Sequence, residues 1–198
     1  MNNDFIDYNK LFLKFPNQND KEMIINYEKK LFELWCISEK SLSSCVNINF
    51  GYWLNNIIND SKGFSDKECY SGVSIFLYYL IYDNEIIGSG SLRINPECNN
   101  ILKETGGHIG YGIRPDKRGK GFGTYFCHLL LEKAQENDLS KVMITCKEDN
   151  IGSSKIIENN FGEYIDKVKD RDNVTYKRYL IDVEKSLIEF NDKINKLK

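Results

Sequence analysis

The sequence predicts an α/β protein with a central, twisted, mixed β-sheet and helices on its faces. From residue 73 onwards, short runs of β-branched and aromatic residues alternate with segments whose apolar residues recur at helical spacing. The resulting order of strand, helix, strand, helix and strand requires crossover helices, which place the central strands parallel to one another. The first third of the chain differs, because its pattern is polar and helical.

Composition limits the class of protein and its partners. At 198 residues the chain fits one domain, which we place at 1–183, followed by a helical tail at 184–198. The formal net charge of -2 provides no strong positive field, so nucleic acid is not an expected partner. The longest apolar stretch, near 73–82, is about half as long as a membrane-spanning helix, and the start of the chain lacks a signal-peptide pattern. We therefore expect no membrane contact and a cytoplasmic location.

The cysteines indicate reduced thiols and no metal site. They are scattered without a C-x-x-C pair, and only two histidines accompany them, which argues against zinc. In a cytoplasm such thiols stay reduced. The six cysteines are Cys36, Cys45, Cys69, Cys98, Cys127 and Cys146.

Two helices and a hairpin are predicted before residue 95. An apolar stripe from Ile24 to Cys36 indicates one helix, and a second is expected near Tyr52–Ile58, before a polar loop at 61–66. Asp83-Asn84 then separates two apolar, β-branched runs, which is the pattern of a β-hairpin whose second strand continues to Ile94.

The elements after residue 95 surround a conspicuous loop. A loop at 96–100 precedes a strand at 108–113, which ends because the residue before Pro115 is held in extended geometry. A helix follows, with apolar residues recurring from Phe122 to Ala134. The remaining predictions are a strand at 142–146, a helix at 151–160 and a strand at 175–183.

The segment between the strand at 108–113 and the next helix is a basic glycine loop, which predicts an anion site. Backbone N–H groups at a helix N-terminus are unpaired and carry the positive end of the helix dipole, and glycines let a phosphate approach them closely. Arg118 and Lys120 add positive charge beside these donors.

The spacing of the glycines decides which phosphate ligand is expected. No Gly-Lys-Ser or Gly-Lys-Thr occurs, so the Walker pattern for nucleotides is absent. Gly119, Gly121 and Gly123 are spaced two apart, so the dinucleotide pattern G-x-G-x-x-G fails as well. The pattern that fits is R-x-x-G-x-G, at Arg118, Gly121 and Gly123.

With this motif the chain resembles the GNAT family of acetyltransferases. The context agrees, because Asn150 and Ser153 open a later helix as in the family's N-x-x-[SA] signature. The likeness covers about 73–183, whereas 1–72 corresponds to the family's variable acceptor-binding part. The run Gly106-Gly107-His108-Ile109-Gly110 is similar to a bacterial subgroup in which such a strand leads into the cofactor loop.

The resemblance implies a GNAT fold, in which two splayed parallel strands lie at the centre of the sheet, and acetyl-CoA as co-substrate. The backbone at Ile113 and Arg114 would bind the pantetheine arm, and the thioester would lie between the strands at His108 and Val142. Asn150 and Ser153 correspond to positions near the pantetheine. The residues that the resemblance assigns to the phosphate loop are Arg118, Gly119, Lys120, Gly121, Phe122, Gly123 and Thr124.

Two residues are candidate general bases for the attack of a primary amine on the thioester. Strand alternation places His108 and Glu104 on one glycine-rich face if Glu104 already lies in the strand, and an imidazole suits proton transfer near neutrality. We favour His108, with Glu104 acting directly or through a water as the alternative. Catalysis would come mainly from positioning both substrates and from backbone donors near the carbonyl.

Other side chains are expected to have simpler roles. Tyr111 is expected in the core and His128 at the surface. Cys146 is expected to be a small buried hydrophobe rather than a covalent acyl carrier.

The resemblance breaks at the general acid. Many GNAT enzymes carry a tyrosine seven residues after the asparagine, where this chain has Ile157. Tyr164 and Tyr125 are candidate substitutes, and a thiolate with a pKa near 8.5 can also leave without a dedicated acid.

The expected function is acetyl transfer from acetyl-CoA to a small-molecule amine or a peptide, by a monomer or a homodimer. Three alternatives stay open. The first is a catalytically silent acyl-CoA-binding module, which Ile157 suggests. The second is an acetyltransferase of protein N-termini or lysines. The third is an ATP-binding protein, which the absent Walker pattern disfavours.

Overall fold

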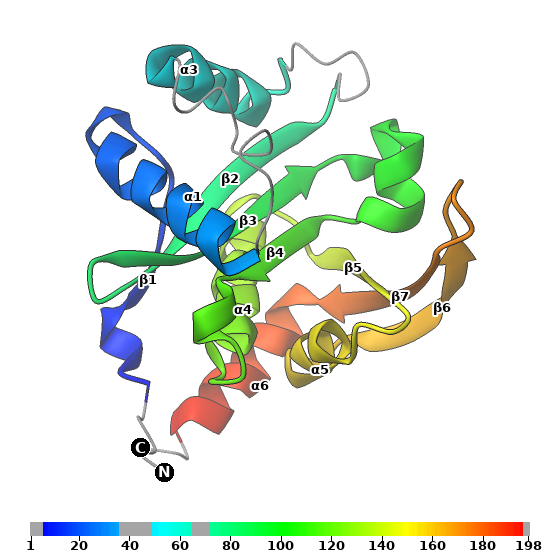
Figure 1. Ribbon diagram of the computed structural model, residues 1–198. Helices are drawn as coiled ribbons and strands as arrows, with labels where there is room; N and C mark the ends of the chain where they lie inside the picture. The colour runs from blue at the N-terminus through cyan, green and yellow to red at the C-terminus, as the bar shows by residue number, and fades with distance from the viewer. Residues whose placement is uncertain (1–5, 36–48, 65–71, 196–198) are drawn as a thin grey trace.

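The computed structural model describes residues 6–35, 49–64 and 72–195 (Figure 1). Cys36, Cys45, Cys69 and the end of the predicted 61–66 loop lie outside this part. The described strands are β1 (Leu11–Lys14), β2 (Ser74–Tyr82), β3 (Glu85–Ile94), β4 (Ile109–Ile113), β5 (Lys141–Lys147), β6 (Glu163–Lys169) and β7 (Thr175–Asp182). The described α-helices are α1 (Lys21–Trp35), α3 (Phe50–Ser61), α4 (Phe122–Glu136), α5 (Ile151–Asn159) and α6 (Val183–Asn195). None of these helices is long and apolar enough to cross a membrane.

The strands form two antiparallel sheets, in the orders β1-β2-β3-β4 and β5-β7-β6. Helix α4 connects the two edge strands β4 and β5, which form no ladder with each other in the described chain. They meet where both begin, because His108 N donates to Met143 O at 2.8 Å. Beyond that contact they diverge around a cavity. The α/β class and the splayed central strands are confirmed, whereas the parallel pairing is limited to this one contact.

The predicted hairpin of β2 and β3 is confirmed. Asp83 and Asn84 both have positive φ, 50° and 63°. This is the geometry of a type I′ turn, whose twist matches that of the flanking strands and which Asp and Asn tolerate better than other side chains. The turn sets the register of β3, which in turn carries the edge strand β4.

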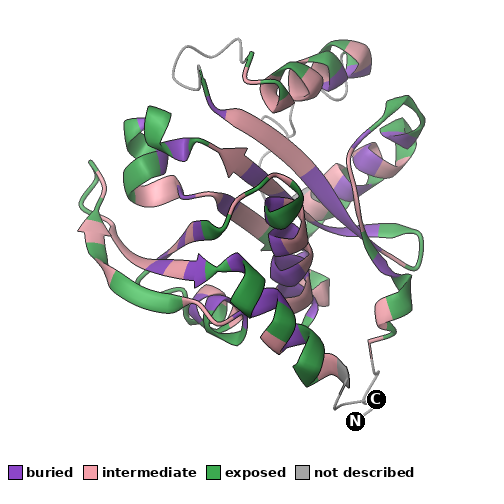
Figure 2. Ribbon diagram, turned by 180° about the vertical axis from the view of Figure 1, so that it is seen from behind, coloured by how far each residue is buried: buried purple, intermediate pink, exposed green. Residues whose placement is uncertain are grey.

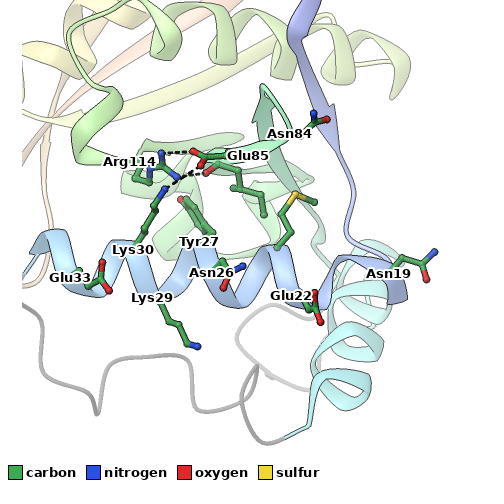
Figure 3. Close-up of a pocket in the computed structure, with 12 residues that line it drawn as sticks. Asn19, Glu22, Asn26, Tyr27, Lys29, Lys30, Glu33, Asn84, Glu85 and Arg114 are labelled. Carbon is green, nitrogen blue, oxygen red and sulfur yellow. Dashed lines mark hydrogen bonds and ion pairs between the residues drawn. The ribbon is translucent and has the colours of Figure 1, made fainter.

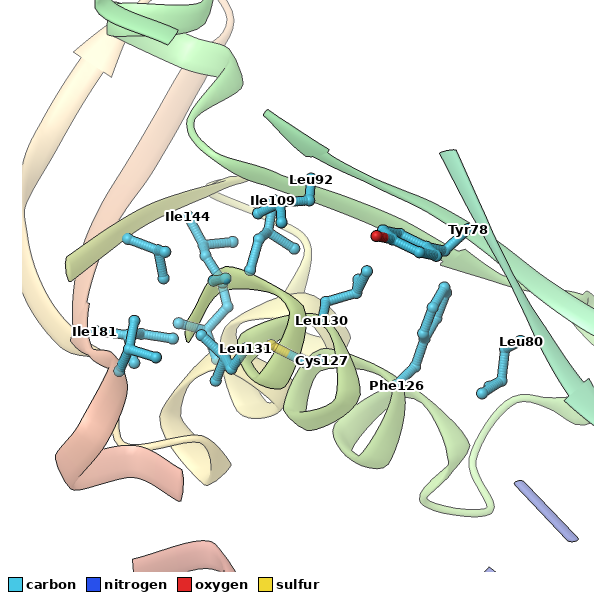
Figure 4. Packing of buried hydrophobic residues seen from close by; sticks show 14 of the residues in the cluster. Tyr78, Leu80, Leu92, Ile109, Phe126, Cys127, Leu130, Leu131, Ile144 and Ile181 are labelled. Carbon is cyan, nitrogen blue, oxygen red and sulfur yellow. The ribbon is translucent and has the colours of Figure 1, made fainter. Parts of the chain in front are cut away.

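Helix α4 forms the centre of the core. Its residues Phe126, Leu130 and Leu131 are completely buried. They belong to one cluster with Ile109 from the first sheet and Ile144 from the second (Figure 4), and Figure 2 shows that buried residues run along this helix. Helices α1 and α3 cover the opposite face of the first sheet through a separate apolar cluster. The first sheet is therefore covered on both faces, and this packing fixes the position of its edge strand β4.

Helix α6 spans most of the helical tail predicted at 184–198, and it packs against α4. Its side chains Leu187 and Phe190 are buried, and the ring of Phe190 stacks on His128 of α4 at 4.1 Å. The prediction that His128 lies at the surface is therefore wrong, since only 2% of this residue is exposed.

Three local predictions were also wrong. The first third of the chain contains the strand β1 in addition to helices, and β6 was not predicted. Glu104 lies in a short π-helix, Leu102–Gly106, and not in a strand, so it does not share a strand face with His108. The physical reason is that Gly107, at φ 63°, turns the chain sharply before β4 begins.

Candidate active site

A cavity of about 300 Å³ opens between β4 and β5 beyond their contact at His108. We call it the gap cavity. Its walls are β4 on one side and β5 on the other, with side chains from β3 and β7 at its rim. The lining residues used below are Arg93, Gly110, Tyr111, Thr145, Lys147 and Tyr176.

The backbone of β4 presents hydrogen-bonding groups to this cavity. His108 O accepts from Arg93 N at 2.7 Å, and Arg114 N donates to Ile87 O at 2.8 Å, so the even-numbered residues of this stretch bond to β3. In an antiparallel pair the direction of the backbone groups alternates along the strand. The groups that point away from β3, towards the gap, therefore belong to Ile109, Tyr111 and Ile113.

A second cavity, of about 500 Å³, lies over the glycine loop, and we call it the loop cavity. Its lining contains most of the residues predicted for the cofactor. Lys120 and Phe122 are not among them: Lys120 is exposed, and Phe122 is buried in the core against Tyr82 at 4.9 Å. The predicted residues that do line the cavity are Ile113, Arg118, Gly119, Gly121, Gly123, Thr124, Asn150 and Ser153.

The loop leaves the first turn of α4 accessible to an anion. Gly121 is the N-cap of α4 with φ 92° and has no side chain that could occupy the helix N–H groups. Gly119, at φ 74°, has open space where a Cβ would stand. Such a cradle of positive-φ glycines before a 15-residue helix fits a phosphate group. Gly123 has a different role, because a Cβ there would lie 2.6 Å from the Ile156 side chain of α5.

Arg118 connects this loop to β4, since its Nε donates to Ile113 O at 2.9 Å. We expect Arg118→Ala to weaken CoA binding by about 1 to 3 kcal/mol, the usual worth of one charge-assisted contact. Calorimetry should give a smaller loss for acetylpantetheine, which lacks the pyrophosphate, and Arg118→Lys should retain part of the affinity. Equal losses for both ligands would instead mean that Arg118 acts only through the geometry of β4.

Arg114 does not direct its side chain to either cavity. The guanidinium is buried and pairs with Asp116 at 2.7 Å. It also pairs with Glu85 at 2.9 Å, on the α1 side of the sheet (Figure 3). There it lines a third cavity, of about 670 Å³, between α1 and the β2–β3 hairpin, where Lys30 also contacts Glu85. Because Arg114 N is bonded to β3 as well, only Ile113 of the predicted pair presents its backbone to the cofactor side.

The gap cavity and the loop cavity meet at three residues, Tyr111, Asn150 and Ser153, which line both. Asn150 is the N-cap of α5, where its Oδ1 accepts from Ser153 N at 3.0 Å. The hydroxyl of Tyr111 lies 3.1 Å from Ser153 Oγ. Tyr111 packs against the core, as predicted, but strand alternation alone did not reveal that its polar end reaches this junction.

His108 lies at the closed end of the gap and is not among the residues that line it. The ring nitrogen Nδ1 of His108 accepts from the backbone N–H of Met143 at 3.0 Å. The backbone N–H of His108 donates to Met143 O. Burial lowers the pKa of the imidazole. With Nδ1 engaged, the proton of the neutral ring is on Nε2, so neither nitrogen is available as a base. The geometry favours a role for His108 in joining β4 to β5.

The other candidate acid and base residues lie away from the gap. Glu104 is exposed and does not line the cavity. Tyr164 is 53% exposed on β6, and Tyr125 packs between Tyr8 and Phe190 beside α6. Ile157, at the position of the usual tyrosine, is completely buried in the core. Cys146, by contrast, lines the gap cavity; it is buried, as predicted, and its Sγ lies 3.4 Å from Ser154 Oγ.

Comparison with known proteins shows which family the chain matches. The family model of the acetyltransferase (GNAT) family matches residues 46–162. No curated protein sequence matches the chain significantly.

Similar solved structures include RimL, a ribosomal L7/L12 α-N-protein acetyltransferase in complex with coenzyme A (TM-score 0.62, 18% identity, covering 88% of this chain and 96% of that one). Another is RimJ from Mycobacterium smegmatis in complex with CoA-disulfide (TM-score 0.64, 11% identity, covering 88% of this chain and 83% of that one). A third is a chimera of the spermidine N-acetyltransferase SpeG from Vibrio cholerae and hSSAT (TM-score 0.60, 17% identity, covering 90% of this chain and 98% of that one). At these identities the likeness establishes the fold alone.

Proposed function

The chain belongs to the GNAT acetyltransferase family, and we propose that it transfers the acetyl group of acetyl-CoA to a primary amine by direct attack in a ternary complex. One observation carries the proposal: the loop cavity, built for an anion, continues at Tyr111 and Ser153 into the gap cavity between the splayed strands. A ligand with phosphates at one end and a reactive group at the other fits this succession. We further propose a cytoplasmic location, where acetyl-CoA is at hand.

In this proposal the chain contributes mainly orientation. The backbone groups of Tyr111 and Ile113 hold the pantetheine arm as an added strand would, and the donors of β4 polarise the thioester carbonyl. The described lining of the gap contains neither a carboxylate nor an imidazole. Water therefore takes the proton of the amine, and the neutral amine attacks the carbonyl carbon once both substrates are aligned.

The charges of the gap cavity favour one class of acceptor. Its formally charged lining residues in the described chain are Arg93 and Lys147, both positive. Positive charge lowers the pKa of a nearby amine, which favours the attacking form, and it repels a second ammonium group on the same molecule. We therefore propose an acceptor that carries an anionic group near its amine, such as a peptide with an acidic residue after its N-terminus, rather than a polyamine.

An assay of CoA release tests both parts of this proposal. At equal concentration, the peptide Ser-Asp-Asp should be acetylated about fivefold or more faster than spermidine, because two like charges close together cost about 1 kcal/mol or more. Lys147→Glu should narrow or reverse this preference, whereas Lys155→Glu, which alters only the loop cavity, should affect CoA binding instead. Faster release with spermidine would contradict the acceptor class. CoA binding without release for any amine would favour the silent module.

A further inference from the structure

We propose that Tyr111 is a catalytic residue whose hydroxyl donates a hydrogen bond to the CoA sulfur as the carbon–sulfur bond of the thioester breaks. The inference rests on the proposed function and assigns to β4 a role that Ile157, at the position of the usual tyrosine in α5, cannot fill. It concerns the point at which the two cavities join.

The first argument is position. A sulfur that lies between a pantetheine arm in the loop cavity and an acetyl group in the gap cavity must pass the junction of the two. Only Tyr111, Asn150 and Ser153 line both cavities among the described residues. The Oδ1 of Asn150 already accepts from the backbone N–H of Ser153 as the helix cap. The hydroxyls of Tyr111 and Ser153 remain as donors at this junction, and the phenol is the more acidic of the two and so the stronger donor to a sulfur.

The second argument is orientation. The ring of Tyr111 packs edge-on against Phe126 of α4, with 6.4 Å between centroids, so the side chain is held from the core. Its hydroxyl lies 3.1 Å from Ser153 Oγ, where either oxygen can be the donor, and it donates to Ser153 O over a longer distance of 3.5 Å. When the hydroxyl of Ser153 donates to the phenol oxygen, a ligand sulfur at the junction can replace the distant Ser153 O as the acceptor of the phenol proton.

The third argument is protonation state. Burial raises the pKa of Tyr111 well above its usual value, so the hydroxyl still holds its proton at the pH where a free thiol ionises. A free thiol ionises near pH 8.5. Tyr111 therefore remains a hydrogen-bond donor over the range in which the CoA thiolate forms. It stabilises that thiolate without giving up its own proton.

The chemical step is balanced. The amine nitrogen forms a bond to the carbonyl carbon, and the pair of electrons of the carbon–sulfur bond moves to sulfur, which leaves as the thiolate. The proton of the amine goes to water. Tyr111 contributes charge stabilisation in a partly desolvated site, where a single donor has a large effect on the rate.

Another tyrosine shares the gap cavity and provides the control. Tyr176 of β7 lines the wall opposite β4 but not the loop cavity. Tyr176 is half-buried. Tyr176→Phe removes one hydroxyl from a residue that lines the gap cavity, just as Tyr111→Phe does, and so is a matched control. Only a residue at the junction should act on the sulfur.

The test is a titration of the thiol of bound CoA, followed by the ultraviolet absorbance of the thiolate. In wild type the bound thiol should be about tenfold more acidic than in Tyr111→Phe, a difference of about one pKa unit. Tyr176→Phe should behave as wild type, and all three proteins should bind CoA equally well at pH 6, where the thiol is neutral. This readout needs no acceptor amine, and a purely structural role of the hydroxyl would not produce it.

Turnover supplies the second readout. With an accepted amine, Tyr111→Phe should lower kcat about 10- to 100-fold and leave the KM for acetyl-CoA nearly unchanged. Equal thiol acidity in wild type and Tyr111→Phe, with CoA binding intact, would overturn the role of Tyr111 and leave the proposed function standing. Failure of the wild-type protein to bind CoA would overturn both.

Discussion

Replacing Gly121 by valine is expected to abolish measurable CoA binding, with a loss of affinity of about 100-fold or more. Gly121 caps α4 at φ 92°, a conformation that a β-branched residue adopts only with strain. The substitution would therefore move the loop away from the N–H groups of the first turn, and it would place two methyl groups beside them. Loss of two charge-assisted hydrogen bonds to a phosphate accounts for at least this magnitude.

The control for this experiment is Gly63→Val. Gly63 also has positive φ, 76°, but lies after α3 and outside the loop cavity. Both variants carry comparable backbone strain, so the temperature of thermal unfolding should be lower than in wild type for both. Calorimetry should show a loss of CoA binding in Gly121→Val alone. A folded Gly121→Val protein with wild-type affinity would mean that the phosphates bind elsewhere.

The second large effect concerns acid stability and depends on His128. Burial lowers the pKa of this imidazole to about 4 from an ordinary value of 6.5. The folded state is therefore not penalised by this residue above pH 6.5, where the imidazole is neutral in the folded and the unfolded chain. As the pH falls towards 4 the folded state loses stability, because the unfolded chain takes up a proton that the folded chain excludes. Glu132, 3.6 Å from Nε2, would favour a charged ring, but burial outweighs it: among the described residues the buried Nδ1 has no hydrogen-bond partner, and the ring stacks on Phe190.

We expect the free energy of unfolding to be about 2 kcal/mol lower at pH 5 than at pH 7 through this residue alone, and up to about 3 kcal/mol lower near pH 4. Urea unfolding of wild type and His128→Leu at the two pH values measures the effect. Carboxylates titrate in both proteins, so the difference between them isolates the imidazole. The same pH dependence in both proteins would contradict the assignment.

The parts of the fold that were predicted correctly are those whose determinants are local. Asp83-Asn84 encodes its turn within two residues, and the apolar spacing from Phe122 to Ala134 identifies α4 without reference to any partner. The glycine loop is also local, because positive φ at Gly119 and Gly121 follows from residue type. These elements form the loop cavity.

The errors concern features that depend on distant partners. β6 carries alternating charges and is largely exposed, so it becomes a strand only because β7 pairs with it. β1 has four residues and similarly depends on β2. His128 stands in an apolar run from Phe126 to Leu131, and the nearest charges in sequence are Glu132 and Lys133. Its burial is completed by α6, more than 50 residues further along the chain, and that contact is not encoded in the helix itself.

The candidate site divides in the same way. The loop residues follow from a motif, but the roles of His108 and Tyr111 depend on which groups of β5 and α5 reach them. Strand alternation placed His108 on a glycine-rich face without indicating that Met143 N–H would engage its Nδ1. It also placed Tyr111 on the core face without indicating that its hydroxyl would reach Ser153.

The central position of β7 in the second sheet has a consequence for the limits of the autonomous folding unit. The family match ends at residue 162, before β6, β7 and α6 begin. A fragment cut to the matched residues would keep β5 without its partner strand and would uncover Ile144 and Val142, which are now buried. The family match therefore ends before the packed core does, because α6 contributes Leu187 to that core and the ring of Phe190 that covers His128.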